Sequence, residues 1–358
     1  MNANPPHDVI LVGCGAVSQQ FYLPALLALE RRGVLVVKHV VDPNPAALAK
    51  VARAFPRARA GASAEGAPLE PGSLAIIASP PRFHAEQTIG AIGRGWHVLC
   101  EKPVSTTLKE AEAMVAAARS HGRLLAVGLY KRFFPSSRYL HDLCHRGQLG
   151  RLVSFTATEG GTFRWPAASV SFFDKSQTFG GVLADVGVHL FDLLGWWLGP
   201  PSRVVYADDA MGGIESNAWV ELSYSGGARG TIHLSRDWQT DQSYRFHFES
   251  GLVHWKVNDA NGMTVQLNGT DSALKATLVP AISADGEYSE VAKSSNAQSF
   301  IEQLRNVIAA IEGRAELVVP GTEAIGSLRL ILDCYASKGF LEQPWLPARE
   351  AERARALA

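Results

Sequence analysis

Short apolar runs alternate with helical patterns through the N-terminal part of the chain, and this alternation constrains the fold more than any other feature. The runs are rich in β-branched residues and cover 8–13, 34–41, 73–79, 97–100 and 123–128. Helical periodicity follows the runs, for example over 45–55 and 108–120. Strands and helices that alternate this regularly predict an α/β fold with a parallel, doubly wound sheet.

The pattern changes near residue 130. A helix is expected over 135–146, and strands of alternating polarity, joined by short turns of Gly, Asn and Ser, follow after residue 200. Neighbouring strands of this kind predict an antiparallel or mixed sheet with one covered face. We therefore expect two domains, a doubly wound domain over 1–130 and an α+β domain over 131–345.

Three local features complete this outline. Residues 268–295 are polar and rich in Ala and Ser, so we expect a long loop there. Two amphipathic helices, over 297–311 and 323–338, are expected near the end of the chain. Pro24 lies inside the first helical pattern and predicts a kink, because proline has no backbone N–H to donate.

Composition and charge argue against several classes of protein. The chain has 358 residues with 34 basic and 34 acidic side chains, and a formal net charge of zero offers no basic surface to nucleic acid. The apolar runs are too short or too interrupted to span a bilayer, and the N-terminal residues lack a signal-peptide pattern. The four cysteines form no C-x-x-C pair, which argues against a disulfide framework. We expect a cytoplasmic protein that binds neither nucleic acid nor membrane.

The turn after the first apolar run has the spacing of a dinucleotide-binding loop. Residues 13–18 are GCGAVS, with Ser18 in place of the usual last glycine. Gly13 permits the tight turn, and Gly15 lets the backbone approach a pyrophosphate. Asp42 ends the second strand, where its carboxylate would bind ribose hydroxyls and repel a 2′-phosphate. This predicts a Rossmann domain that binds NAD in preference to NADP, with contacts from Gly13, Gly15, Ala16, Val17 and Asp42.

A lysine follows the strand at 97–100 directly. Glu101, Lys102 and Pro103 lie at the carboxyl end of a parallel strand, which is where open α/β sheets bind ligands. A lysine there can contact the oxygen on a reacting carbon. A solvated lysine beside an acidic neighbour explains this tripeptide equally well.

A second group of candidate residues lies in the sequence GGVLADVGVHLFD over 180–192. Asp185 and His189 are four residues apart, which places them on one face of a helix that is otherwise apolar. Burying both groups is costly unless they pair or face a cleft, and a histidine can take and return a hydroxyl proton. Two other interpretations are a structural pair and a metal site. The metal site lacks an obvious third ligand, although three histidines are available downstream: His233, His247 and His254.

Taken together, these motifs resemble the Gfo/Idh/MocA family of NAD(P)-dependent oxidoreductases. The resemblance is carried by VGCGAVSQQFYLPAL, VVDP, HVLCEKPVSTTLKEA and GGVLADVGVHLFDLLGWWLG, and it extends over nearly the whole chain. It implies that Lys102 orients the substrate hydroxyl, that His189 is the general acid/base and that Asp185 binds a neighbouring hydroxyl or tunes His189. It also implies a second domain with a large, mostly antiparallel open sheet, one face of which is used for homodimer or homotetramer contacts.

Some residues depart from the family pattern or extend it. The turn after the third strand is Ser79-Pro80-Pro81 where family members often have Thr-Pro-Asn, so nucleotide contacts there must come from the backbone. The remaining cofactor contacts expected are Ser79, Pro80, His84, Glu101 and Lys102. A loop before the helix at 180–192 carries Arg164 and Trp165, which offer a cation and a stacking face to a ligand. With Arg132, a further cation, they complete the expected substrate contacts, and loop packing or surface exposure are the alternatives.

The resemblance predicts an enzyme that moves a hydride between NAD and a ring hydroxyl or keto carbon of a sugar, sugar derivative or cyclitol. Lys102 and His189 would handle the hydroxyl proton, and no metal is expected. Two other functions use the same residues or the same fold. One is an NAD-assisted glycoside hydrolase, and the other is a regulator that binds nucleotide without catalysis.

Overall fold

The computed structural model describes residues 5–164, 173, 178–278, 296–342 and 346–357. The chain divides into two compact units. The described part of the first unit comprises 5–130 and 296–328, and that of the second comprises 131–164, 173, 178–278, 329–342 and 346–357. The sequence predicts one domain over 131–345, whereas the structure assigns residues 296–328 to the first unit.

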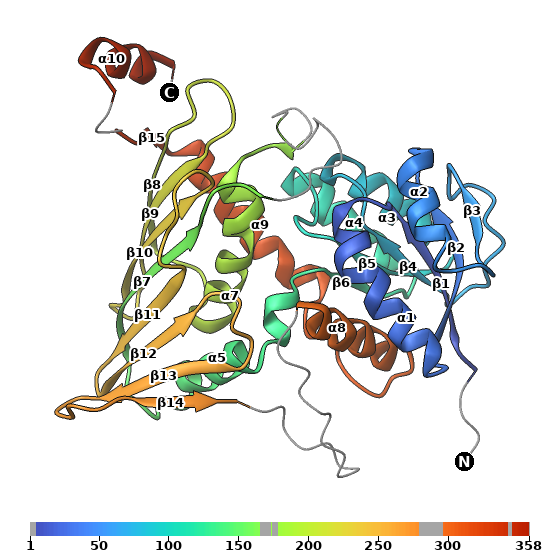
Figure 1. Cartoon of the computed structure of the whole chain (residues 1–358), viewed down its shortest axis with the longest axis horizontal. Helices are drawn as coiled ribbons and strands as arrows, with labels where there is room; N and C mark the ends of the chain where they lie inside the picture. Colours follow the sequence, from blue (N-terminus) through green and yellow to red (C-terminus); the bar gives the residue numbers. More distant parts are fainter. Residues whose placement is uncertain (1–4, 165–172, 174–177, 279–295, 343–345, 358) are drawn as a thin grey trace. The chain divides into compact units, whose positions relative to one another are not determined.

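The first unit is built on a six-stranded sheet in the order β3-β2-β1-β4-β5-β6 (Figure 1). The strands are β1 (His7–Val12), β2 (Leu35–Val41), β3 (Arg59–Gly61), β4 (Leu74–Ile77), β5 (His97–Cys100) and β6 (Leu125–Val127). All neighbouring strands are parallel. This is the strand order of a dinucleotide-binding Rossmann fold, so the predicted doubly wound sheet is confirmed.

Helices cover this sheet and supply much of its core. They are α1 (Leu23–Arg31), α2 (Pro45–Ala52), η2 (Pro81–Phe83), α3 (His84–Gly93), α4 (Leu108–Ser120), α8 (Asn296–Ile311) and the first part of α9 (Gly321–Ala336). Buried side chains of α8 share one apolar cluster with the strand residues Leu11 and Leu74; those of α8 are Phe300, Leu304, Val307 and Ile308. This apolar burial explains why 296–328 belongs to the first unit and not to the second.

The helix after the glycine loop changes type at the position where the sequence predicts a kink. A π-helical turn, η1 (Ser18–Tyr22), precedes α1, and Pro24 falls in the first turn of α1. Residues 16–31 form one unbroken helical run, in which η1 interrupts the α-helical pattern directly before Pro24. Because Pro24 has no N–H to donate, the distortion that the sequence predicts takes the form of this π-helical turn.

The second unit contains a nine-stranded sheet in the order β14-β13-β12-β11-β7-β10-β9-β8-β15. The strands are β7 (Leu152–Gly160), β8 (Arg203–Asp208), β9 (Asn217–Ser223), β10 (Arg229–Ser235), β11 (Ser243–Phe248), β12 (Gly251–Lys256), β13 (Gly262–Leu267), β14 (Leu274–Thr277) and β15 (Lys338–Phe340). Among these described strands only the β7/β10 and β8/β15 pairs are parallel, so the mostly antiparallel sheet is confirmed. Strand β14 lies within 268–295, where the sequence predicts only a loop.

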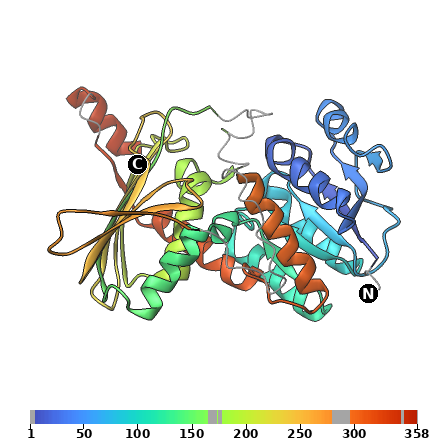
Figure 2. The same ribbon diagram turned by 60° about the horizontal axis from the view of Figure 1, so that its bottom comes forward.

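Helices pack on one face of the nine-stranded sheet (Figures 1 and 2). They include α5 (Pro135–Arg146), the π-helical turn η5 (Leu183–Gly187) and α7 (Val188–Leu198), and a further helix, α10 (Ala348–Leu357), follows near the C-terminus. Trp197 of α7 makes edge contacts with the rings of Phe246 and Trp255, at centroid distances of 5.5 and 6.1 Å. These contacts fix α7 against β11 and β12.

One buried histidine of the first sheet makes the stability of the fold depend on pH. His97 accepts the backbone N–H of Leu124 at 3.0 Å, and burial, reinforced by Arg123, lowers its pKa to about 4. The unfolded state takes up a proton near pH 6.5, so stability is lost as the pH falls from there toward 4. As the pH falls from about 7.5 to 5, protonation of His97 in the unfolded state should lower the free energy of unfolding by about 2 kcal/mol.

Asparagine in place of His97 keeps an acceptor but does not titrate. The variant should therefore lack the loss of about 2 kcal/mol of unfolding free energy between about pH 7.5 and 5. Urea unfolding of wild type and His97→Asn at both pH values measures it. An equal loss of unfolding free energy in the two proteins would contradict the assignment.

Candidate active site

The glycine loop between β1 and η1 is shaped by close backbone contacts. Gly13 has a φ of +96°, and a Cβ at this position would lie 2.5 Å from the carbonyl carbon and oxygen of Ala78. Only glycine therefore fits. Ser18, which replaces the usual last glycine, is buried and donates its hydroxyl to the carbonyl of Gly13 at 2.6 Å. The serine thus ties the helix start back to the turn.

The same loop presents the features that a dinucleotide needs. A Cβ on Gly15 would meet no atom within 4 Å, so this glycine leaves open space beside the loop where a pyrophosphate can approach. The Asp42 carboxylate accepts the N–H of Cys14 and the N–H of Asn44, each at 2.7 Å. Because each carboxylate oxygen has further acceptor capacity, Asp42 can still receive ribose hydroxyls. These residues fit NAD.

The buried side chain of His84 makes hydrogen bonds to the loops that follow β4 and β5. Its Nδ1 lies 2.8 Å from the carbonyl oxygen of Pro103, and its Nε2 lies 2.8 Å from that of Ser79. The side chain is fully buried, and burial lowers its pKa. The sequence predicts His84 as a cofactor contact, and the structure corrects this because no part of the imidazole is exposed. Its contacts instead position the segments that contain Ser79 and Lys102.

Glu101 lies beneath Lys102. Its carboxylate accepts the Tyr22 hydroxyl at 2.7 Å and the backbone N–H of Lys102 at 3.1 Å. Burial raises the pKa of Glu101, while the Tyr22 hydrogen bond opposes this shift. A Cβ on Gly128 would lie 2.6 Å from the carboxylate, so the neighbouring strand end must be glycine. Glu101, predicted as a cofactor contact, is buried and holds the backbone of Lys102, whose side chain is half-buried.

Asp185 and His189 lie at a junction between two helix types. Asp185 belongs to the π-helical turn η5, and His189 belongs to the first turn of α7. The sequence predicts one regular helix here, and the π-helical turn is a feature that the spacing does not reveal. Such turns occur frequently at functional sites, because they alter which side chains share a face. His189 is 7% exposed, and the side chain of Asp185 is 31% exposed.

Arg236 is a site residue that sequence reasoning misses. It follows the last residue of β10, and its Nη2 lies 3.2 Å from Oδ2 of Asp185. Its guanidinium also lies over the ring of Phe163, 5.6 Å from the centroid. Arg236 is buried, so this ion pair is shielded from water on the arginine side. Only the tertiary fold brings Arg236 close to Asp185. The one local signal is its position directly after a strand, where charged residues can contact a ligand.

Two predicted substrate contacts are placed by the structure, and one is not. Arg132 makes a two-pronged ion pair with Asp192, at 2.9 and 2.7 Å, and it is 3% exposed. This corrects the prediction that Arg132 contacts substrate, because its guanidinium is buried in a structural pair that also packs on Trp196. Arg164 is exposed. Trp165 lies outside the described residues.

The histidines considered for a metal site lie on three separate strands. His233, His247 and His254 belong to β10, β11 and β12. Within the described ranges, no group of three metal-binding side chains could hold a metal ion.

The described helices also include none that is long and apolar enough to cross a membrane.

Two family models match this chain. One, described as an oxidoreductase family with an NAD-binding Rossmann fold, matches residues 7–129. The other, described as the GFO/IDH/MocA C-terminal domain, matches residues 137–254. The chain belongs to the Gfo/Idh/MocA oxidoreductase family. The predicted family, the enzyme class and the NAD-binding fold are thereby confirmed.

Individual relatives are similar over different lengths. The D-glucoside 3-dehydrogenase of Escherichia coli K12 is 36% identical over 126 residues, which cover 35% of this chain and 36% of that enzyme. The 1,5-anhydro-D-fructose reductase of Ensifer adhaerens is 29% identical over 257 residues, or 70% of this chain and 73% of that enzyme. A solved levoglucosan dehydrogenase with NADH has a TM-score of 0.81 and 19% identity, and covers 93% of this chain and 96% of that one. At this identity, the structural likeness supports the fold.

The two loop glycines predict different outcomes for the same substitution. Gly15→Ala should lower NADH affinity at least about tenfold without lowering the melting temperature, because the new methyl group enters the space left for pyrophosphate. Gly13→Ala should lower the melting temperature, because it clashes with the Ala78 backbone and requires an unfavourable φ.

Fluorescence titration with NADH and thermal unfolding of both variants test this pair. Wild-type NADH affinity in Gly15→Ala would contradict the location of the pyrophosphate site.

Proposed function

We propose that the protein transfers a hydride between NAD and a ring hydroxyl or keto carbon of a sugar, sugar derivative or cyclitol. The observation that carries this proposal is the ion pair of Asp185 with Arg236, four residues before His189 in the sequence, in a chain whose N-terminal domain is that of NAD-binding oxidoreductases. The names of the two relatives above, a glucoside dehydrogenase and an anhydrofructose reductase, support a carbohydrate substrate.

The cofactor would be held by the glycine loop and Asp42. When bound, NAD supplies the hydride acceptor, and its reduced form supplies the donor. Asp42 favours NAD over NADP, because a 2′-phosphate would meet a carboxylate whose two oxygens are already fixed by backbone N–H groups. The turn at Ser79 and Pro80 would contribute backbone contacts.

Three side chains would act on the substrate. Asp185 would accept a hydrogen bond from a substrate hydroxyl, because an ionised carboxylate paired with Arg236 can only accept. Lys102 would donate to the oxygen of the reacting carbon and stabilise negative charge that develops there. His189 would take the hydroxyl proton on its imidazole as the carbinol is oxidised, and would return it when the ketone is reduced.

We further propose that the protein forms a homodimer or homotetramer in the cytoplasm through the face of the nine-stranded sheet opposite α5 and α7. Val205 and Trp219 are exposed on neighbouring strands, with 42% and 38% of their surface accessible. Exposed apolar residues on a sheet face favour burial against a second subunit. The four cysteines are free thiols, which supports a reducing compartment.

Substitution of the proposed catalytic residues tests the function. Lys102→Ala and His189→Ala should each lower kcat at least about a hundredfold, because each removes a group that acts on the reacting hydroxyl. NADH affinity should stay within about threefold of wild type. The assay is NADH absorbance over free sugars, glycosides, cyclitols and their keto forms, followed by fluorescence titration with NADH.

The pattern of results separates this function from its rivals. Loss of NADH binding in both variants would contradict the assigned roles. Release of an aglycone with no net change in NADH would indicate an NAD-assisted hydrolase, and tight NADH binding without turnover of any substrate would favour a regulator.

A further inference from the structure

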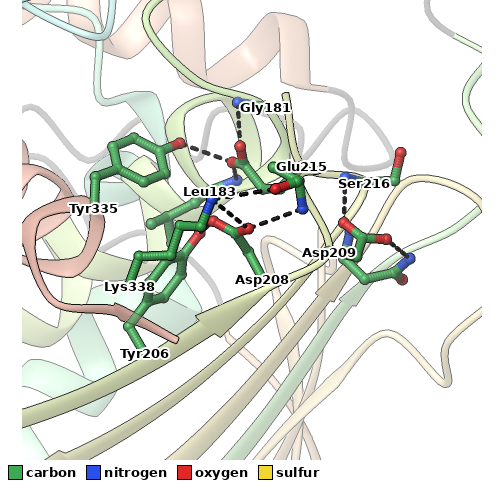
Figure 3. Close-up of polar contacts among 11 residues, drawn as sticks. Gly181, Leu183, Tyr206, Asp208, Asp209, Glu215, Ser216, Tyr335 and Lys338 are labelled. Carbon is green, nitrogen blue, oxygen red and sulfur yellow. Dashed lines mark hydrogen bonds and ion pairs between the residues drawn. The ribbon is translucent and has the colours of Figure 1, made fainter. Parts of the chain in front are cut away.

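We propose that Glu215 is the positioning residue of the helix that carries Asp185 and His189. Glu215 lies in the segment before β9, is 2% exposed and belongs to a cluster of polar side chains in the second unit (Figure 3). It acts on the start of η5 and not on the substrate. The inference rests on the proposed function, because it assumes that Asp185 and His189 are the reacting side chains.

One residue binds three consecutive N–H groups at this helix start. The Glu215 carboxylate accepts the N–H of Gly181 and the N–H of Leu183, each at 2.9 Å. Its backbone carbonyl accepts the N–H of Val182 at 3.0 Å. The first N–H groups of a helix lack intrahelical partners, and a nearby side chain usually caps them. Val182 provides no side-chain cap, so Glu215 supplies it from more than 30 residues along the chain.

The carboxylate is itself held in place. The Tyr335 hydroxyl of α9 donates to Glu215 at 2.7 Å (Figure 3). Burial raises the pKa of Glu215, and the hydrogen bonds from Tyr335, Leu183 and Gly181 oppose that shift. A carboxylate with donors on both oxygens is oriented in one direction.

The glycine pair before η5 follows from this arrangement. A Cβ on Gly180 would lie 2.0 Å from the Tyr335 hydroxyl, and a Cβ on Gly181 would lie 2.1 Å from the carbonyl oxygen of Glu215. Any side chain at either position would push the capping groups away. The two glycines therefore leave room for the Glu215 carboxylate and the groups that hold it, which we call the Glu215 anchor. This explains why the helix bearing Asp185 begins with Gly-Gly.

The segment that contains Glu215 also holds the partner of Asp185. The carbonyl of Ser216 accepts the backbone N–H of Arg236 at 2.8 Å. The Asp209 carboxylate accepts the N–H of Ser216 at 2.9 Å (Figure 3). Two adjacent residues thus fix the helix start on one side and the Arg236 backbone on the other. Displacement of Glu215 would change the geometry of the Asp185–Arg236 pair.

A neighbouring carboxylate provides a matched control. Asp208 is equally buried and accepts the Tyr206 hydroxyl at 2.8 Å and the N–H of Ala210 at 2.9 Å. Its ammonium partner is Lys338, at 3.6 Å. These contacts are with β8, the following turn and β15, so Asp208→Asn perturbs the same cluster without removing a partner of η5.

The first experiment is amide hydrogen exchange over 180–189 in wild type, Glu215→Gln and Asp208→Asn. The Gly181 and Leu183 N–H groups lie on different oxygens of the carboxylate, so in glutamine one of them faces the amide NH2, which is a donor. We expect exchange in this segment to accelerate at least about tenfold in Glu215→Gln and to stay within about twofold of wild type in Asp208→Asn. Equal acceleration in both variants would overturn the proposal.

The second experiment measures kcat, KM and NADH affinity. Glu215→Gln should lower kcat about tenfold or more and leave NADH affinity unchanged. Asp208→Asn should keep kcat within about threefold of wild type, even if its melting temperature falls as much as that of Glu215→Gln. If Glu215→Gln does not fold, Tyr335→Phe removes one hydrogen bond to the anchor, and we expect a kcat loss of about two- to fivefold. Wild-type kcat in the folded variant would overturn the proposal. Absence of turnover in the wild type refutes the proposed function alone, because hydrogen exchange still reports on the anchor.

Discussion

Carboxylates that bind backbone N–H groups hold three of the segments that carry candidate site residues. Asp42 binds the N–H of Cys14 in the glycine loop, Glu101 binds that of Lys102, and Glu215 binds those at the start of η5. Hydrogen bonds to an ionised acceptor are stronger than neutral ones, and a buried N–H left without a partner costs about 1–3 kcal/mol. The loops that would bind cofactor and substrate therefore depend on these acceptors for their shape.

Two of these carboxylates are buried, and the structure around them is correspondingly restricted. Burial raises the pKa of both Glu101 and Glu215, since desolvation disfavours the charged form. In each case, hydrogen bonds from a tyrosine hydroxyl and from backbone N–H groups oppose this rise in pKa. Each also excludes a side chain from a facing backbone, at Gly128 and Gly181 respectively. Glycine at 128 reflects close approach to the Glu101 carboxylate, and glycine at 181 reflects close approach to the backbone carbonyl as well as the carboxylate of Glu215.

The sequence predicts those parts of the fold and site that depend on local order along the chain. The alternating runs give the parallel sheet, and the spacing of Gly13, Gly15 and Asp42 gives the nucleotide loop, because a strand, a turn and a helix in succession suffice to place them. The missed features depend on contacts between distant residues. Neither the approach of Arg236 to Asp185 nor the capping of η5 by Glu215 leaves a periodic signal. The errors at His84 and Arg132 have the same origin, since burial by other elements decides whether a polar side chain meets a ligand.

Isotope labelling shows directly whether a ring carbinol hydrogen moves as hydride to the nicotinamide. The substrate that turns over is prepared with deuterium on each ring carbinol carbon in turn, and the reduced cofactor and the product are analysed by mass spectrometry. We predict that one labelled position transfers its deuterium to the nicotinamide and leaves a ketone at the same carbon. Reduced cofactor without label from any ring carbon, or a product with every carbinol deuterium retained, would contradict it.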